Sequence, residues 1–98
     1  MFMGNKTYQN YMSDADIIEV YKKDRKAGNE KMIEKYRDYI YYVIKKYYPT
    51  FHNETPDMFQ HGAIGMMNAM TSYDASKGAF TTHCTPYIKK EISNSNYL

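Results

Sequence analysis

Apolar residues recur at steps of three and four along several stretches of the chain, a spacing that places side chains on one face of an α-helix. The clearest stretch covers residues 57–71 and is introduced by Thr55 as the N-cap, Pro56 at the first helical position and acidic Asp57. Its inward side chains, several of them small, are predicted to be Phe59, Gly62, Ala63, Met66, Ala69 and Met70. We therefore predict a central helix that another helix can approach closely.

Two helices are predicted before this one. Ser13 begins the first, because the sequence S-D-A-D resembles a capping box, and Gly28 ends it as a C-cap residue. Asn29 caps a longer second helix over residues 30–48, which Pro49 stops. The inward side chains of the second helix are predicted to be Ile33, Tyr36, Ile40, Val43 or Ile44, and Tyr47.

A last helix is predicted after a turn over residues 72–79, which are rich in residues that favour turns. Thr81 or Thr82 is expected to open this helix, so that Pro86 lies near its first turn, where proline costs little. Its buried side is predicted to be Phe80, Cys84, Ile88 and Ile92.

The length of 98 residues fits one small domain. We expect an all-α fold, a compact bundle of about four helices over residues 13–98, after a flexible N-terminal arm over residues 1–12. A single cysteine cannot form an internal disulfide, which favours a cytoplasmic location. No apolar run approaches the roughly 18–20 residues of a membrane span, so we expect no membrane partner.

The net charge is +2, but the positively charged residues are unevenly distributed along the chain. Nine lysines and arginines lie within residues 22–46, none within residues 47–76, and three within residues 77–90. We interpret the first group as the solvated side of two helices, with a weak nonspecific contribution to DNA binding as the alternative.

The second face of the helix over residues 57–71 mixes a carboxylate, amides, a histidine and apolar groups, without lysine or arginine. Its residues are Asp57, Gln60, His61, Ile64, Met67 and Asn68. A purely solvated face usually carries more charge, so this mixture favours contact with a protein partner. The alternative is a polar helix side that tolerates singly exposed apolar residues.

Catalytic or metal chemistry has little support in the sequence. Asp57 and His61 are four residues apart and could share a helix face, but two groups do not make a metal site. His83 and Cys84 show no ligand spacing, and the thiol is interpreted as a small buried hydrophobe. We expect a protein without enzymatic activity or cofactor, and keep a small hydrolase or metal protein as a third alternative.

The segment from Asp57 to Ile92 resembles the second conserved region of bacterial sigma factors, and the resemblance extends back to about Ile17. One residue of the family pattern is missing between Gly78 and Phe80. The residues in register with that pattern are Asp57, Gln60, Gly62, Gly65, Met67, Ala69, Tyr73, Asp74, Lys77, Gly78, Phe80, Thr82, Ile88, Lys89 and Ile92. So many matches across nearly forty residues are more specific than a short motif.

The resemblance implies that the lysine-free face docks on the RNA polymerase core, at the clamp helices, a coiled coil of the β′ subunit. By position, Asp57, Gln60 and Met67 match the contact residues of the family. His61 and Ala63 stand where glutamate and asparagine are common, which implies weaker or retuned docking.

The resemblance also implies that the region from Phe80 to Lys90 contacts the minus-ten promoter element, mainly its displaced non-template single strand. Proline at Pro86, in place of a tryptophan of the primary factors, is familiar from alternative and sporulation-type sigma factors. The implied DNA-binding residues are Phe80, Thr82, His83, Tyr87, Lys89 and Lys90. Their cationic and aromatic groups suit capture of a single strand, whereas the alternative interpretation of Phe80 and Tyr87 is that both are core aromatics.

Two hypotheses follow from these features. The first is a transcription-initiation domain that binds polymerase and contacts promoter DNA. The second is a sigma mimic that occupies polymerase and modulates the resident sigma factor without reading DNA, and an anti-sigma factor is a further candidate partner. The helix-turn-helix module that reads the minus-thirty-five element in the family is absent from these residues, so we expect either a domain excised from a longer factor or a stand-alone protein.

Overall fold

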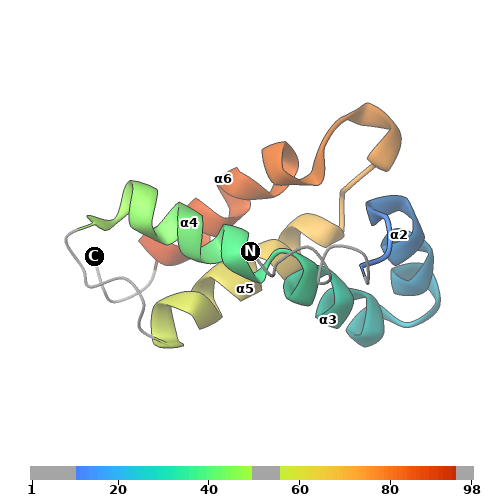
Figure 1. Cartoon of the computed structure of the whole chain (residues 1–98), viewed down its shortest axis with the longest axis horizontal. Coiled ribbons are helices and arrows are strands. Elements are labelled where there is room, and N and C mark those ends of the chain that lie inside the picture. Colours follow the sequence, from blue (N-terminus) through green and yellow to red (C-terminus); the bar gives the residue numbers. More distant parts are fainter. Residues whose placement is uncertain (1–10, 50–55, 95–98) are drawn as a thin grey trace, which may run out of the picture.

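The computed structural model describes residues 11–49 and 56–94, and these residues form an all-helical bundle (Figure 1). Its elements are α2 (Asp14–Lys23), α3 (Arg25–Lys35), α4 (Arg37–Tyr47), α5 (Pro56–Met70), the 3₁₀-helix η2 (Ala75–Lys77) and α6 (Phe80–Ser93). The predicted all-α class is confirmed, with five α-helices in this part of the chain instead of about four. None of these helices is long and apolar enough to cross a membrane.

Helices α2 and α3 form a tight hairpin. Ser13 caps α2 as predicted, because its side chain accepts a hydrogen bond from the Asp16 amide at 3.1 Å. The prediction that Gly28 ends this helix is wrong. Asp24 ends α2 and caps α3, and Gly28 lies buried inside α3, where an added Cβ would be 2.4 Å from Tyr21 Cα. Gly28 therefore allows α2 and α3 to pack closely and does not act as a C-cap residue.

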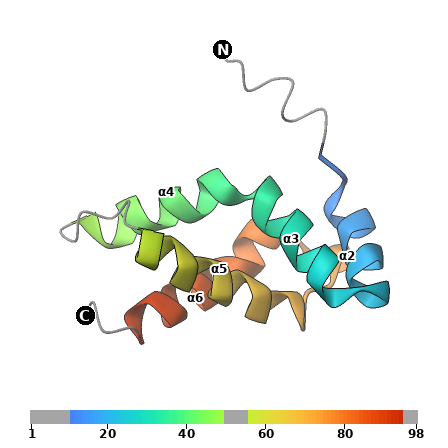
Figure 2. The ribbon, with the colours of Figure 1, turned by 90° about the horizontal axis from the view of Figure 1, so that it is seen from below.

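The predicted long helix over residues 30–48 is wrong as well, because the chain bends at Tyr36 and divides it into α3 and α4. Tyr36 has φ −109° and ψ 23°, outside the helical range, although neither glycine nor proline stands there. Figure 2 shows that the bend lets α3 run beside α2 while α4 extends along α5 and α6.

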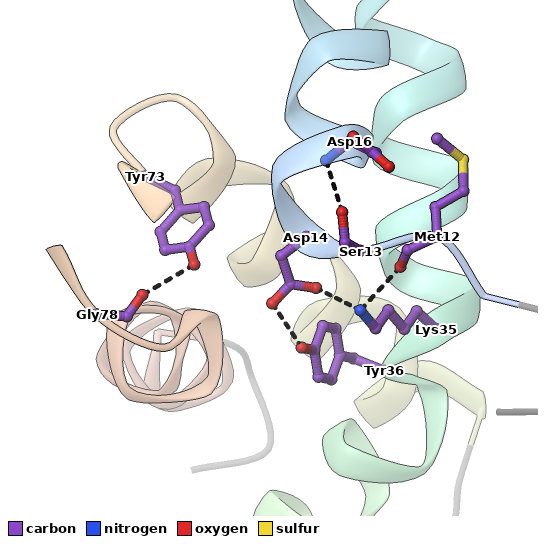
Figure 3. Close-up of polar contacts among 8 residues, drawn as sticks. All are labelled: Met12, Ser13, Asp14, Asp16, Lys35, Tyr36, Tyr73 and Gly78. Atoms are coloured by element: carbon purple, nitrogen blue, oxygen red, sulfur yellow. Dashed lines mark hydrogen bonds and ion pairs between the residues drawn. The ribbon is translucent and has the colours of Figure 1, made fainter. Parts of the chain in front are cut away.

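A polar cluster holds this bend against α2 (Figure 3). Lys35 Nζ donates to Asp14 Oδ1 at 2.7 Å and to the Met12 carbonyl oxygen at 2.9 Å. The Tyr36 hydroxyl donates to Asp14 Oδ2 at 2.8 Å, so that one carboxylate engages both residues at the bend. Burial, and then this hydrogen bond, raise the pKa of Tyr36, and the phenol keeps its proton. The bend is thus fixed by contacts between residues far apart in sequence.

The core lies between α5, α6 and α4. The inward residues predicted for α5 are buried, except Phe59, which is half-buried and stacks on Tyr41 with ring centroids 4.9 Å apart. On α4 the buried residues include Ile40, Val43 and Ile44. Tyr47 was also predicted to face inward, but it is 40% exposed and Tyr48 is buried in its place.

Helix α6 begins at Phe80, slightly earlier than predicted, and its four predicted buried residues are all fully buried. The expectation that Pro86 lies near the first turn is wrong, since Pro86 stands in the middle of the helix. Proline has no N–H to donate to the carbonyl of Thr82 one turn earlier. The remaining turns are held by packing of the buried side against α5 and α4.

Candidate functional site

The lysine-free face predicted from the sequence lies on the outside of α5. Asp57, Gln60, Ile64 and Asn68 are exposed, and His61 and Met67 are half-buried at its two edges. Ile64 is 37% exposed, so a large aliphatic side chain stands among polar groups on this face. The structure therefore brings all six predicted residues together on one surface, which we call the α5 face.

Two glycines fix the orientation of this face, because they allow the inner side of α5 to pack closely against α6 and α4. An added Cβ at Gly65 would be 2.5 Å from the Tyr87 carbonyl oxygen and 2.7 Å from Ile88 Cα. An added Cβ at Gly62 would be 2.6 Å from Ile40 Cγ2. Because the backbones of α5 and α6 nearly touch at Gly65, α5 cannot rotate without a clash, and its outer residues are held outward.

The outer side of α6 carries five of the six predicted DNA-binding residues. Thr82 and Lys90 are exposed, while His83, Tyr87 and Lys89 are half-buried. They do not form one row. His83 and Tyr87 lie on the flank toward the end of α5, and Lys89 lies on the opposite flank, with its Nζ 4.0 Å from the centre of the Tyr47 ring on α4.

Phe80 does not belong to this surface, and the prediction that its ring is available to DNA is wrong. Its side chain is 0% exposed. The ring packs against Tyr36 and Tyr73, with centroid separations of 5.5 Å and 4.9 Å. A nucleic-acid base cannot reach a ring face that is buried in this way, so the core interpretation of Phe80 holds. Tyr87, for which the same doubt existed, keeps part of its surface exposed.

A small polar network joins the end of α5 to α6. His83 Nε2 lies 3.1 Å from the Ala69 carbonyl oxygen and 3.2 Å from Ser72 Oγ. The same Ser72 oxygen lies 3.0 Å from the Tyr87 hydroxyl. Ser72 lies two residues after the end of α5 at Met70, so the His83–Tyr87 flank of α6 lies near the C-terminal end of α5.

The turn between α5 and α6 is ordered by its own side chains. The Asp74 carboxylate accepts hydrogen bonds from the Ser76 hydroxyl and amide, and these bonds lower the pKa of Asp74. The Tyr73 hydroxyl donates to the Gly78 carbonyl at 2.9 Å (Figure 3), and Gly78 has φ 149°, a conformation that favours glycine. An open pocket of about 420 Å³ lies between this turn and α6, lined by Ser72, Tyr73, Asp74, Lys77, Gly78, Ala79, Thr82 and His83.

The cysteine is part of the core. Cys84 is 0% exposed, and burial raises the pKa of its thiol to about 12, so the neutral thiol persists at physiological pH. Within residues 11–49 and 56–94, no group of three or more histidine, cysteine, aspartate or glutamate side chains could hold a metal ion. The interpretation of Cys84 as a small buried hydrophobe is confirmed.

Sequence reasoning missed the role of Ser72, which it treated only as a turn residue. No periodicity could have indicated it, because its contacts with His83 and Tyr87 depend on how the turn folds back. The proposed N-cap of α5, Thr55, lies outside the described residues.

Comparison with known families agrees with this geometry. The family described as Sigma-70 region 2 matches residues 32–95, which are 64 of the 98 residues and run from α3 to just beyond α6. No curated protein and no solved structure matches the chain. The matched segment contains the α5 face, the turn and the outer side of α6. The chain therefore belongs to the sigma-70 region 2 family, whose members are transcription-initiation domains that bind RNA polymerase and promoter DNA.

Proposed function

We propose that the α5 face docks on the clamp helices of the polymerase β′ subunit, and that the outer side of α6 contacts the minus-ten promoter element on the displaced non-template strand. The docking residues are Asp57, Gln60, His61, Ile64, Met67 and Asn68. The DNA-contacting residues are Thr82, His83, Tyr87, Lys89 and Lys90, without Phe80.

The observation that carries this proposal is the continuity of the two surfaces at Ser72. Ser72, which lies in the turn after α5, contacts both His83 and Tyr87, so a protein bound along the C-terminal part of α5 would lie near the aromatic flank of α6. A factor that docks on polymerase and then holds an opened strand needs this arrangement, because docking sets where the strand meets the domain.

The chemistry of the α5 face suits a coiled coil. Ile64 and Met67 offer apolar groups that can enter the holes between side chains of a partner helix. Gln60 and Asn68 can hydrogen-bond at the rim, and the face brings no lysine or arginine into the contact. Docking then depends on a small apolar centre with a polar rim.

Ile64→Lys tests the docking part directly. The exposed position keeps the fold intact, while the new ammonium group would be buried without a partner against the coiled coil. We expect the amount of core polymerase captured by the immobilised domain to fall about tenfold or more.

Ala15→Lys is the matched control, since Ala15 is exposed on α2 and the substitution adds the same charge. It should capture polymerase as the original chain does. If Ile64→Lys has an unchanged circular dichroism spectrum and captures as much polymerase as the original chain, the α5 face is not the docking surface.

A second candidate function is the sigma mimic, and the burial of Phe80 favours it, because α6 offers fewer aromatic faces to DNA than the sequence predicted. Lys90→Gln separates the two functions. If α6 contacts DNA, the complex with core polymerase should bind a single-stranded minus-ten oligonucleotide in a salt-sensitive manner, and the variant should bind it less tightly. A mimic should displace the resident sigma factor from polymerase with no such binding, whatever stands at position 90.

A further inference from the structure

A row of aromatic rings joins α2 to the outer side of α6. The row starts at Tyr36, whose hydroxyl donates to Asp14 Oδ2 on α2 at 2.8 Å. Between centroids, the Tyr36 ring lies 5.5 Å from the Phe80 ring, and the Phe80 ring lies 4.9 Å from the Tyr73 ring. The Tyr73 ring in turn lies 5.5 Å from the His83 ring. The contacts therefore lead from a carboxylate on α2 to a residue of the proposed DNA-contacting side.

Both tyrosines of this row have a fixed hydroxyl group (Figure 3). Tyr36 is held by Asp14, and the Tyr73 hydroxyl donates to the Gly78 carbonyl oxygen at 2.9 Å. Burial, and then the negative charge of Asp14, raise the pKa of Tyr73, so the carboxylate is near enough to act on both tyrosines. Phe80 packs against both rings and is 0% exposed. The Phe80 ring therefore has little freedom as long as Tyr36 stays in place.

The first turns of α6 depend strongly on side-chain packing. The N-cap residue of α6 is Ala79, which has no side-chain acceptor for the free amides of the first turn. Pro86 removes one backbone hydrogen bond in the middle of the helix. The segment between these two positions starts with the buried Phe80 and carries Thr82 and His83 on its outer side. The packing of Phe80 therefore has a large share in placing these two outer residues.

The second half of α6 and the α5 face are held by other contacts. Gly65 allows the backbone of α5 to approach Tyr87 and Ile88 closely. Tyr48 of α4 donates to the Lys89 carbonyl oxygen at 3.0 Å. These contacts do not involve α2. A disturbance at the bend between α3 and α4 should thus reach the first turns of α6 before it reaches the docking surface.

The Asp14 carboxylate has two partners at this bend. Its Oδ1 accepts a hydrogen bond from Lys35 at 2.7 Å, and its Oδ2 accepts the one from Tyr36. Lys35 Nζ also donates to the Met12 carbonyl oxygen at 2.9 Å, so the ammonium group keeps this partner when the carboxylate is removed. Loss of Asp14 should therefore act mainly through the Tyr36 ring.

We propose that Asp14 is a positioning residue for the DNA-contacting side of α6. By holding Tyr36 against Phe80, it fixes the start of α6 and with it the outer residues of the first turns. The inference rests on the proposed function, because it concerns how that side is placed. Asp14 lies before residues 32–95, the segment that matches the family, so this contribution comes from a helix outside the matched segment.

The test compares Asp14→Ala with Asp16→Ala, each in complex with core polymerase, by fluorescence anisotropy with a labelled single-stranded minus-ten oligonucleotide. Asp16 is exposed in the same first turn of α2, so its loss removes the same charge near the helix N-terminus. We expect Asp14→Ala to bind the oligonucleotide about threefold to tenfold more weakly, a partial loss because His83 keeps its contact with the Ala69 carbonyl oxygen. Asp16→Ala should bind as the original chain does, and both variants should capture core polymerase normally.

The sign of this effect separates positioning from electrostatics. Removal of a negative charge by itself favours the binding of DNA, because it lowers the repulsion of phosphates. Weaker binding by Asp14→Ala therefore cannot come from the lost charge. Amide hydrogen exchange adds a second readout: residues 81–85 should exchange faster in this variant while residues 88–92 keep their protection, whereas a general loss of stability would affect both segments.

Tyr36→Phe tests the route, since it removes the hydroxyl donor and keeps the ring, and it carries the test if Asp14→Ala does not fold. It should reproduce much of the loss of DNA binding. The double variant Asp14→Ala, Tyr36→Phe should bind no more weakly than Asp14→Ala alone, because the two residues act through one hydrogen bond.

Unchanged DNA binding by Asp14→Ala, equal losses of DNA binding and polymerase capture, or an equal effect of Asp16→Ala would each overturn the inference. If Lys90→Gln weakens DNA binding while the Asp14 and Tyr36 variants do not, the inference fails alone and the proposed contact of α6 with DNA stands. If the original complex does not bind the oligonucleotide, the DNA part of the proposed function fails and the inference fails with it.

Discussion

Phe80→Ala is expected to lower the free energy of unfolding by about 3–5 kcal/mol, the usual cost of removing a fully buried phenylalanine ring. Phe80 is 0% exposed and lies against the rings of Tyr36 and Tyr73. The substitution loses the transfer free energy of the ring and leaves a cavity between the α3–α4 bend and the turn before α6. Urea denaturation followed by circular dichroism measures the change.

Phe80→Leu separates the core role from a DNA-contacting role. Leucine refills most of the cavity but offers no aromatic face, so it should recover a substantial part of the lost stability. If Phe80 acted only in the core, Phe80→Leu would leave binding of single-stranded DNA unchanged once the domain is folded. A variant that is fully stable but unable to bind DNA would show instead that the ring opens to stack on a base.

The helices that follow a regular apolar period were predictable from the sequence. In α6 the buried residues follow a strict step of four, and each is fully buried as expected. In α5 one side of the helix is apolar with small residues and the other is mostly polar, and this difference identified the buried side and the exposed side. Pattern reasoning succeeded there because helical geometry alone decides which side chains share a face.

The bend at Tyr36 could not be predicted, since nothing local breaks the helix there. The bend is held by Asp14, more than twenty residues away, through hydrogen bonds with Lys35 and Tyr36. The prediction that Gly28 ends a helix failed for a related reason. A glycine near a polar run usually marks a helix end, but here it gives room to the backbone of Tyr21, a requirement visible only once α2 and α3 are packed.

For the candidate site, exposure was predicted well on α5 and less well on α6. Asp57, Gln60, Ile64 and Asn68 are exposed as predicted, since their side of the helix lacks a continuous apolar stripe. Phe80 was assigned from residue type at a family position, and residue type cannot tell a stacking platform from a core ring.

The relative position of the α5 face and the outer side of α6 depends on the close contact of the two helices at Gly65. Gly65→Ala tests this dependence. The new Cβ would lie 2.5 Å from the Tyr87 carbonyl oxygen and 2.7 Å from Ile88 Cα, so a helix backbone has to move. We expect a net loss of about 2–3 kcal/mol in the free energy of unfolding, since overpacking outweighs the better helix propensity of alanine.

Gly62→Ala is the matched control for this substitution, because its Cβ meets the Ile40 Cγ2 methyl at 2.6 Å and then nothing closer than 3.6 Å. The Ile40 side chain is buried and β-branched, but a small change in its χ1 costs less than separating two helix backbones, so Gly62→Ala should cost less than Gly65→Ala in the same urea denaturation. Gly65→Ala should also weaken polymerase capture, since displacing α6 moves Ser72 and Tyr87 relative to the α5 face. Equal stability of the two variants would mean that the helices separate easily at Gly65 and that their contact does not hold the α5 face in place.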